Sequence, residues 1–355
     1  MRRFAVNMPK NLNEFIAYYN ALCAKQHPFV LFRLPQTQEI ICYQQPDKKH
    51  HQTQTLTENG FVFAPFAAQD SYTFIPDIIK KRFTIPNHLF TPKNTASEFE
   101  SQNKAYYMEL VAAAKSTIKN SALKKVVISR QHIEPFRGSV ATSFLKLAHA
   151  YPNAMVYFWS HPHTGDWLGA TPETLLSAEE GVCKTMALAG TLPYKENVSP
   201  NWTSKEIDEQ QLVVDFIQVQ LERIFPKNSI RLMPTYSKRA GNLVHLCADF
   251  EASLGNATTL DVMRLLHPTP AVAGVPIQES LSFLGEHETH NRKYYAGVLG
   301  PVMPNSVHLF VNLRCAEVSK DALTLYVGGG ITAQSHAETE WLESQRKAET
   351  LLSVL

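Results

Sequence analysis

Hydrophobic residues recur at helical spacing in two long segments of the chain, residues 11–26 and 97–119. The first segment contains Asn11 and Asn13 as candidate caps, and the second begins at Ser97, a residue type that often caps a helix. The pattern therefore predicts two amphipathic helices, one near the N-terminus and one about a third of the way along the chain.

Short hydrophobic runs between polar stretches predict strands elsewhere. The runs cover residues 29–34, 40–43, 60–66, 126–128, 154–159, 167–176, 186–191, 294–300 and 309–316. Residues 45–56 are polar and predict a loop, and three prolines break up residues 70–95, which we expect to be irregular. Turn signals near Gly165 and Gly181 favour antiparallel neighbours. Together these patterns predict an α/β protein of the α+β type with large antiparallel sheets.

Three glycines follow a short alternating run near the C-terminus. Residues 323–327 alternate as a strand does, and Gly328, Gly329 and Gly330 come next. Glycine leaves its backbone N–H group uncovered and its torsions free, which suits close approach to an anion. We therefore predict that the strand breaks here and that its amides form a nest for an anionic ligand.

The helix expected from about Ala337 carries Glu340, Glu343 and Lys347 at spacings of three and four, so these side chains share one face. The combination suggests an anion held through a divalent metal ion. An ordinary solvated, charged helix has the same pattern, and this segment alone does not separate the two interpretations.

A second helix, expected from Ser204, carries Glu206 and Glu209 three positions apart. Acidic residues in a first helical turn also stabilise the helix dipole, which is a purely structural explanation. Two helices that each carry paired glutamates could hold a hard cation, because Mg²⁺ prefers carboxylate, water and ligand oxygens.

Two residues beside strands are candidates for proton transfer. Lys125 leads into a hydrophobic run, where loss of solvent would favour its neutral, basic form, although such a lysine is more often exposed. Glu173 follows Pro172 at the start of a strand, where burial would keep a carboxyl protonated as a general acid must be.

Three further residues stand in settings that suit a binding pocket. Arg314 lies among hydrophobic residues, which is costly unless it meets an anion. His245 has a similar setting, in which a core histidine is an equally good explanation. Thr269 lies in a turn rich in proline and glycine, residues 266–276, which offers a hydroxyl group on a stiff support.

Composition narrows the class of protein. The chain has 355 residues and a formal net charge of +2 without a long basic block, which argues against nucleic acid as the main partner. Its five cysteines are scattered and form no CxxC motif, so neither a disulfide framework nor a zinc site is expected. No apolar run suits a signal peptide or approaches the roughly 18 residues of a membrane span. We expect a reduced, cytoplasmic protein that does not enter a membrane.

Nine segments, taken in order, resemble signatures of the chorismate-utilising enzyme family. They are KKVVISR, GATPETLL, ALAGT, SKEIDEQQLVV, LVHL, HPTPAVAGVP, YYAGVLG, LFVNLRCA and the final VGGGI with ETEWLES and its following lysine. They cover roughly residues 100–352, whereas residues 1–95 match loosely. Within the family the chain is most similar to the isochorismate synthases. The resemblance implies two packed antiparallel sheets flanked by helices, with residues 96–355 as one catalytic core and residues 1–95 as a variable part packed on it.

The resemblance also implies roles for individual residues. Lys125 matches the base that activates water for attack at C2 of chorismate, and Glu173 matches the acid that protonates the departing C4 hydroxyl group. Glu209 and Glu343 match the nearest Mg²⁺ carboxylates, with Glu206 and Glu340 as accompanying acidic positions. The positions that match substrate-binding groups are Gly190, Thr191, His245, Thr269, Tyr295, Arg314, Gly328, Gly330 and Lys347.

The function that the resemblance implies is Mg²⁺-dependent isomerisation of chorismate to isochorismate, feeding menaquinone or siderophore biosynthesis. Lys125 and the HPTPAVAG segment favour water over ammonia as the nucleophile. The alternatives are a salicylate synthase, which also eliminates pyruvate, an aminodeoxychorismate synthase, and a non-catalytic chorismate-binding relative. We expect a monomer or weak dimer that needs no glutaminase subunit.

Overall fold

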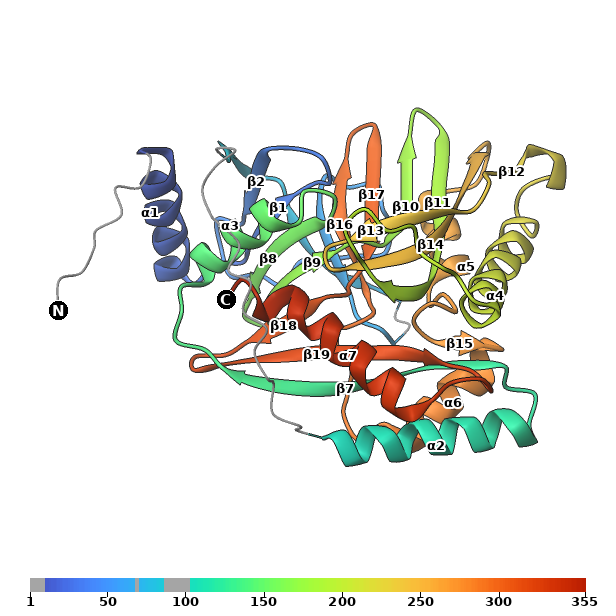
Figure 1. Ribbon diagram of the computed structural model, residues 1–355. Coiled ribbons are helices and arrows are strands. Elements are labelled where there is room, and N and C mark those ends of the chain that lie inside the picture. The colour runs from blue at the N-terminus through green and yellow to red at the C-terminus, as the bar shows by residue number, and fades with distance from the viewer. Residues whose placement is uncertain (1–9, 68–69, 86–102) are drawn as a thin grey trace.

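Alternating hydrophobic residues form two large antiparallel sheets in the computed structural model, which describes residues 10–67, 70–85 and 103–355 (Figure 1). The first sheet has nine strands, in the order β15 (Gly274–Val275), β7 (Lys125–Pro135), β19 (Ala322–Ile331), β18 (Cys315–Val318), β9 (Gly165–Thr171), β8 (Met155–His161), β1 (Phe29–Arg33), β2 (Glu39–Gln44) and β6 (Ile79–Thr84). The expected class, with large antiparallel sheets, is confirmed.

The second sheet has ten strands. Their order is β12 (Arg231–Leu232), β14 (Leu243–Ser253), β11 (Val182–Pro193), β10 (Thr174–Glu179), β17 (Ser306–Val311), β16 (Val298–Met303), β4 (Gly60–Ala64), β5 (Tyr72–Pro76) and β3 (Gln52–Thr53), and β13 (Tyr236–Ala240) pairs with β14 outside this path. The turns at Gly165 and Gly181 both have positive φ, of 78°, and join antiparallel neighbours as expected.

Seven α-helices flank the sheets in the described part of the chain. They are α1 (Lys10–Lys25), α2 (Lys104–Asn120), α3 (Val140–Ala150), α4 (Ser204–Leu221), α5 (Thr259–Leu266), α6 (Ile277–His287) and α7 (Ala337–Leu352), together with one 3₁₀ turn at Lys227–Ser229. Helix α7 lies along β19 beside α2, and α4 packs against β11 and β14 (Figure 1). None of these helices is long and apolar enough to cross a membrane.

The prediction that residues 70–95 are irregular is wrong for the part that the structure describes. Residues 72–84 form β5 and β6, which pair with β4 and β2. Pro76 ends β5 opposite Gly60, a position at which proline is compatible with a strand. The predicted loop at residues 45–56 also contains the short strand β3.

The N-terminal strands β1 to β6, between Phe29 and Thr84, are hydrogen-bonded into both sheets and so belong to the same two layers as the later strands. The predicted boundary between residues 95 and 96 lies outside the described residues, as does Ser97, the expected cap of α2. Helix α2 is described from Lys104 and is preceded by Asn103, with φ 65°.

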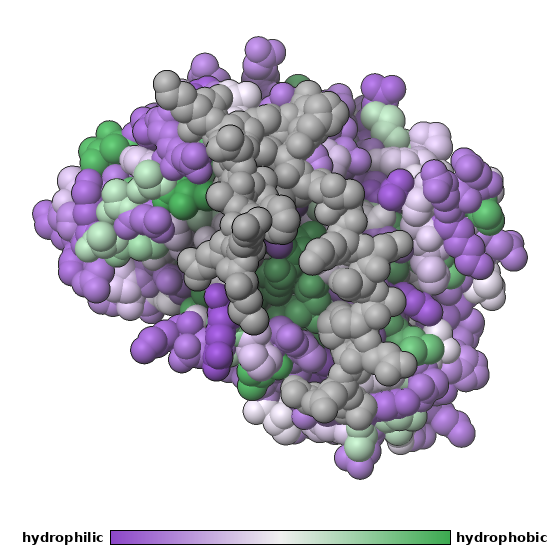
Figure 2. Space-filling view, turned by 60° about the vertical axis from the view of Figure 1, so that its left-hand side comes forward, coloured by the Kyte–Doolittle hydropathy of each residue, from purple (hydrophilic) through white to green (hydrophobic). Residues whose placement is uncertain are grey.

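The main hydrophobic core lies between the two sheets. Trp159 and Trp167 of the first sheet are fully buried, and Phe63 of the second sheet lies with its ring centroid 4.9 Å from that of Trp159. Charged and polar residues dominate the rim of the face in Figure 2, and hydrophobic residues gather in a hollow near its middle. Both sheets are therefore held on one core, which keeps the residues at their facing ends at fixed separations.

Candidate active site

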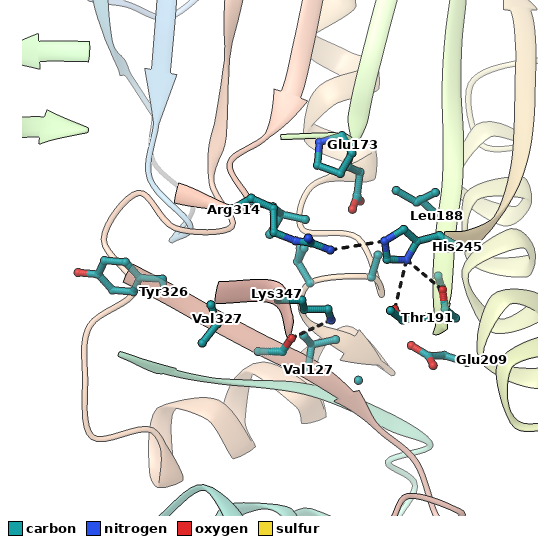
Figure 3. A pocket seen from close by; sticks show the side chains of 18 of the residues that line it. Val127, Glu173, Leu188, Thr191, Glu209, His245, Arg314, Tyr326, Val327 and Lys347 are labelled. Carbon is teal, nitrogen blue, oxygen red and sulfur yellow. Dashed lines mark hydrogen bonds between the residues drawn. The ribbon is translucent and has the colours of Figure 1, made fainter. Parts of the chain in front are cut away.

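A pocket lies where β7 and β19 of the first sheet meet β11 and β14 of the second, and it gathers most of the predicted site residues (Figure 3). The predicted residues that line it are Glu173, Gly190, Thr191, Glu209, His245, Tyr295, Arg314, Gly328, Gly330 and Lys347. These residues come from segments that are far apart in the sequence, so their meeting follows from the fold.

Thr269 does not line this pocket. It is 3% exposed, and its hydroxyl oxygen has no hydrogen-bond partner among the described groups. Its carbonyl oxygen accepts from the backbone N–H groups of Val272 and Ala273. The turn that was expected to present the Thr269 hydroxyl therefore presents Ala271 and Val272 instead.

Arg314 is a buried cation without a carboxylate partner. It is 7% exposed, and no ion pair among the described residues includes it. One guanidinium nitrogen donates to Thr350 Oγ1 at 2.7 Å, and another lies 3.5 Å from His245 Nε2. Burial lowers the pKa of Arg314 from its usual value. Because an unpaired buried charge is costly, an anion bound beside Arg314 would stabilise this arrangement.

His245 is neutral and holds a defined tautomer. Its Nδ1 lies 3.0 Å from the Gly190 carbonyl oxygen, which can only accept, so Nδ1 carries the proton. Nε2 is then free to accept from Arg314, as the dashed line in Figure 3 shows. Burial and the charges of Arg314 and Lys347 lower the pKa of His245 to about 3. His245 therefore orients the guanidinium without adding a charge to the pocket.

Glu173 is a buried carboxyl group between β9 and β10. It is 4% exposed, and its backbone is fixed because the Glu173 carbonyl oxygen accepts from the Val311 N–H at 3.0 Å. Burial raises the pKa of Glu173 to about 7, although the positive charges of Lys125, Lys238, Lys347 and Arg314 oppose that shift. A carboxyl group in this state can donate a proton near neutral pH.

Lys125 stands at the start of β7 and is 1% exposed. Its Nζ lies 2.9 Å from Glu209 Oε1, so the candidate base is paired with a predicted metal ligand. Gly330 makes room for this pair. A Cβ atom on Gly330 would lie 2.6 Å from Glu209 Oε1 and 2.8 Å from Lys125 Cε.

The prediction that the strand breaks at the three glycines is wrong. Strand β19 continues to Ile331, and Gly328, Gly329 and Gly330 pair with Ser129, Ile128 and Val127 of β7. None of the three has a positive φ. Because successive N–H groups in a strand point to opposite sides, these amides do not form a nest.

Close packing explains the glycines. A Cβ atom on Gly328 would lie 2.1 Å from the Ile128 carbonyl oxygen. The other neighbour of β19, strand β18, pairs only as far as Tyr326, so one edge of the glycine segment has no strand beside it among the described residues. Glycine therefore supplies space for the surrounding groups in an ordinary strand conformation.

Residues 36–355 match the family described as chorismate binding enzyme. The chain belongs to this family.

Named relatives include isochorismate synthases. The chain is 29% identical to isochorismate synthase MenF of Haemophilus influenzae over 266 residues, which cover 71% of this chain and 61% of the relative. It is also 29% identical to MenF of Escherichia coli, covering 74% of this chain and 62% of the relative. The chain therefore spans about three fifths of the length of these two relatives.

Solved structures of the family share the fold. DhbC from Bacillus anthracis superposes with a TM-score of 0.80 at 21% identity, covering 97% of this chain and 99% of that one. The structure of E. coli MenF superposes with a TM-score of 0.77 at 21% identity, covering 92% and 88%. At these identities the likeness establishes the architecture.

Three of the four predicted metal carboxylates are paired with lysines in this chorismate binding enzyme. The Nζ–Oε distances are 2.9 Å for Lys125–Glu209, 2.7 Å for Lys205–Glu340 and 2.7 Å for Lys347–Glu343. Among the described residues, no group of three or more His, Cys, Asp or Glu side chains has an arrangement that could hold a metal ion. The lysines thus neutralise the carboxylates that were predicted to bind a cation.

Glu206 has a structural role at the start of α4. Its carboxylate accepts from the Thr203 N–H at 3.0 Å and from Thr203 Oγ1 at 2.6 Å, forming a capping box. Glu206 therefore has a structural role in the first turn of α4, although it acts through a capping box and not only through the helix dipole that the sequence suggested. Using Glu206 as a metal ligand would disrupt the cap.

The remaining carboxylates suit a hard cation in their chemistry. Oxygens of Glu340 and Glu343 would lie 3.5 and 3.7 Å from a Cβ atom on Gly329, so both groups face the same part of β19. Burial and the nearby Glu343 charge raise the pKa of Glu340. Burial opposes ionisation of Glu343, but Lys347 and Lys205 bring its pKa below the usual value. A divalent cation would relieve the repulsion between the Glu340 and Glu343 carboxylates if Lys205 and Lys347 released them.

Several residues of the site had no signal in the sequence. Tyr326 lines the pocket and stacks on Tyr295, with ring centroids 5.5 Å apart. A buried ion pair, Arg292 with Glu288 at 2.7 Å, fixes two pocket walls, because Arg292 donates to the carbonyl oxygens of Val127 and Val272. In the sequence, Glu288 and Arg292 are four residues apart, a spacing that a helical ion pair also has. Only the fold shows that Arg292 bonds to the backbone of Val127 and Val272.

Proposed function

We propose that this protein is a Mg²⁺-dependent isochorismate synthase, which interconverts chorismate and isochorismate. The observation that carries the proposal is one pocket that joins an unpaired buried guanidinium, Arg314, with a buried carboxyl group of raised pKa, Glu173. The named isochorismate synthases among the relatives support the same reaction.

Arg314 and Lys347 would bind the two carboxylates of chorismate. Arg314 is available because it has no acidic partner, and its fork suits a carboxylate. Lys347 donates to the Gly328 carbonyl oxygen at 2.8 Å and pairs with Glu343. To bind a substrate carboxylate, the Lys347 ammonium group would have to leave Glu343 or contact both carboxylates at once. Tyr295 and Tyr326 offer a flat apolar wall for the ring.

The proton chemistry needs an acid and a base. Glu173 would donate its proton to the C4 hydroxyl group, which leaves as water. Lys125 would accept a proton from the water that attacks C2, and the ring double bonds shift to complete the exchange. Lys125 pairs with Glu209, so it would be released to act as the base once Glu209 has another cation to bind.

Glu209, Glu340 and Glu343 are the residues that would hold the magnesium ion. The bound ion would neutralise and orient one substrate carboxylate.

The relatives do not indicate a single pathway. One similar solved structure is described as menaquinone-specific, and a relative from Vibrio cholerae as vibriobactin-specific. The five free cysteines suit a reducing compartment, and we place the reaction in the cytoplasm.

The test is incubation with chorismate and Mg²⁺ without ammonia, followed by chromatography of the products. Isochorismate alone is the expected result. Salicylate with pyruvate would instead indicate a salicylate synthase, and a product formed only after adding ammonia would indicate an aminating enzyme. Absence of turnover with and without ammonia would overturn catalysis and leave a chorismate-binding relative.

A further inference from the structure

A second cavity, which we call the basic vestibule, lies directly against the catalytic pocket and has a volume of about 230 Å³. It is lined by residues 150–154, Ala170, Pro172, residues 238–241, Arg314 and Thr350. Pro172 and Arg314 also line the catalytic pocket, so the two cavities share a wall. Glu173 follows Pro172 directly in the chain, on the catalytic side of that wall.

The vestibule is positively charged. Lys238, Arg239 and Arg314 line it, and none of its lining residues is acidic. No ion pair between described side chains includes any of these three cations. Arg239 lies over the ring of Tyr194 at 3.7 Å from the centroid and donates to the Gly241 carbonyl oxygen. The exposed guanidinium of Arg239 is therefore held by neutral groups, and no carboxylate of a described residue pairs with it.

Lys238 lines the vestibule, and its partner residue on the neighbouring strand, His245, lines the catalytic pocket. Lys238 lies on β13 directly opposite His245 of β14. Its partly buried ammonium group donates to Met186 Sδ at 3.2 Å, a weak acceptor. The positive charge of Lys238 also acts on the Glu173 carboxyl group. Neither the proton chemistry nor the binding of chorismate described above uses this lysine.

We propose that the basic vestibule is the route by which the anionic substrate reaches the catalytic pocket, with Lys238 receiving a carboxylate that then passes to Arg314. This rests on the proposed function, because it takes a dicarboxylate as the ligand. A recess that carries charge of one sign between low-dielectric walls raises the local concentration of the opposite ion and speeds association by about 10- to 1,000-fold. An uncompensated lysine on the path to an uncompensated arginine fits that role.

The experiment compares Lys238→Met with Lys184→Met over a range of ionic strength. Lys184 is an exposed lysine of the same sheet that pairs with Glu251 and lies outside the vestibule, so it controls for the lost charge. We expect Lys238→Met to lower kcat/KM for chorismate about tenfold at low salt, with kcat nearly unchanged. Its kcat/KM should also depend less on salt, whereas Lys184→Met behaves as the unaltered enzyme.

A steric variant tests the route without changing charge. Ala240 lines the vestibule on the edge strand β13, and Ala240→Trp should lower kcat/KM by narrowing the passage. If Lys238→Met keeps the original kcat/KM and salt dependence, the route is overturned. An equal fall in kcat and kcat/KM, with a shifted pH profile, would also overturn it, because Lys238 would then act only on Glu173.

Binding of malonate separates this inference from the proposed reaction. Malonate is an unreactive dicarboxylate, and its binding can be measured by calorimetry in the absence of Mg²⁺ and turnover. We expect weaker malonate binding in Lys238→Met and not in Lys184→Met. If the protein shows this difference in malonate binding but does not turn over chorismate, the anion-binding role of the vestibule is supported and the proposed reaction is overturned. Equal malonate binding in all three proteins would reject the vestibule.

Discussion

At the scale of single residues, burial decides the chemistry of this pocket. Glu173 and Arg314 are both nearly inaccessible to solvent, yet neither has a partner of opposite charge within ion-pair distance among the described residues. Burial raises the pKa of the carboxyl group to about 7 and lowers that of the guanidinium. A carboxyl group in this state can donate a proton near neutral pH, and a guanidinium without an acidic partner can bind an anion.

Glu173→Gln should abolish isomerisation while the protein stays folded. The amide has the same shape but cannot give up a proton, and a positioned general acid is worth about 10² to 10⁴ in rate. The measurement is turnover of chorismate together with the melting temperature. Glu179→Gln, at the exposed end of β10, is the matched control and should retain activity. Activity in Glu173→Gln within a few fold of the original would reject Glu173 as the acid.

The pH dependence of kcat/KM follows from the same carboxyl group, because kcat/KM reports the ionisation of the free enzyme. The pKa of Glu173 is about 7 in the folded protein, which is above its value in the unfolded chain. The folded protein therefore holds the proton more tightly than the unfolded chain does. The rate of the C4 hydroxyl loss should therefore fall as pH rises through about 7. The stability that protonated Glu173 contributes is fully present below its unfolded pKa, and it should be lost as pH rises from that value through the folded pKa. Glu173→Gln should remove that pH dependence of stability, which chemical denaturation at several pH values would measure.

Lys125→Met should stop turnover for a different reason, since it removes the base and also the partner of Glu209. Leaving one member of a buried pair alone costs about 3–5 kcal/mol. We therefore expect a lower melting temperature as well as a rate below detection. Lys124→Met, at the exposed lysine next to Lys125 in the chain, is the control. Retained turnover in Lys125→Met would show that another group is the base.

At the scale of elements, β19 shows how a local pattern and its tertiary use can differ. The glycines look like a strand end, but the pairing with β7 carries the strand through them. Each glycine is needed where another group approaches. Gly328 faces the backbone of β7, and Gly330 faces the Lys125–Glu209 pair. The neighbours, and with them the reason for glycine, come from other parts of the chain.

Alanine at these two glycines should therefore have different effects. Gly328→Ala places a Cβ atom 2.1 Å from a backbone oxygen, which cannot move without opening the sheet, so we expect a loss of stability of several kcal/mol. Gly330→Ala meets the ends of two side chains, so we expect a smaller loss of stability but a large loss of turnover. Melting temperatures and rates measured on both variants test this contrast. Equal losses of stability would contradict it.

At the scale of the whole molecule, the proposed metal carboxylates belong to two helices that pack on different sheets. Glu209 comes from α4, which packs on the second sheet, and Glu340 and Glu343 come from α7 beside the first. Lys205 of α4 already links the two helices through Glu340. A cation bound at these carboxylates would tie the same helices together.

Mg²⁺ should therefore raise the melting temperature of the protein, and EDTA should reverse the rise. At 100 times its dissociation constant, a ligand that binds only the folded state adds about 2.7 kcal/mol. Glu343→Gln should abolish the response to Mg²⁺, whereas Glu338→Gln, an exposed neighbour on α7, should keep it. An equal response in Glu343→Gln would place the ion elsewhere.

Much of this protein follows from its sequence alone. Hydrophobic periodicity predicts most strands and the helices α1 and α2, because the pattern depends on neighbours within one element. The helices expected from Ser204 and from about Ala337 are α4 and α7. The ordered motifs predict the family, and the match over residues 36–355 confirms it. Ten of the residues that line the pocket were predicted. Glu173 and Arg314 stood out by their chemical setting, whereas Gly190, Thr191 and Tyr295 were implied only by the family resemblance.

Only the tertiary structure decided which residues from distant segments contact one another. The pairing of Lys125 with Glu209, the capping role of Glu206, the burial of Thr269 away from the pocket and the vestibule beside Arg314 all join distant segments. Strands β5 and β6 were missed because their pairing partners compensate for proline-rich surroundings. The physical reason is common to all of these: a residue's type and near neighbours set what it can do, but burial and its contacts across the fold set its charge, its space and its partner.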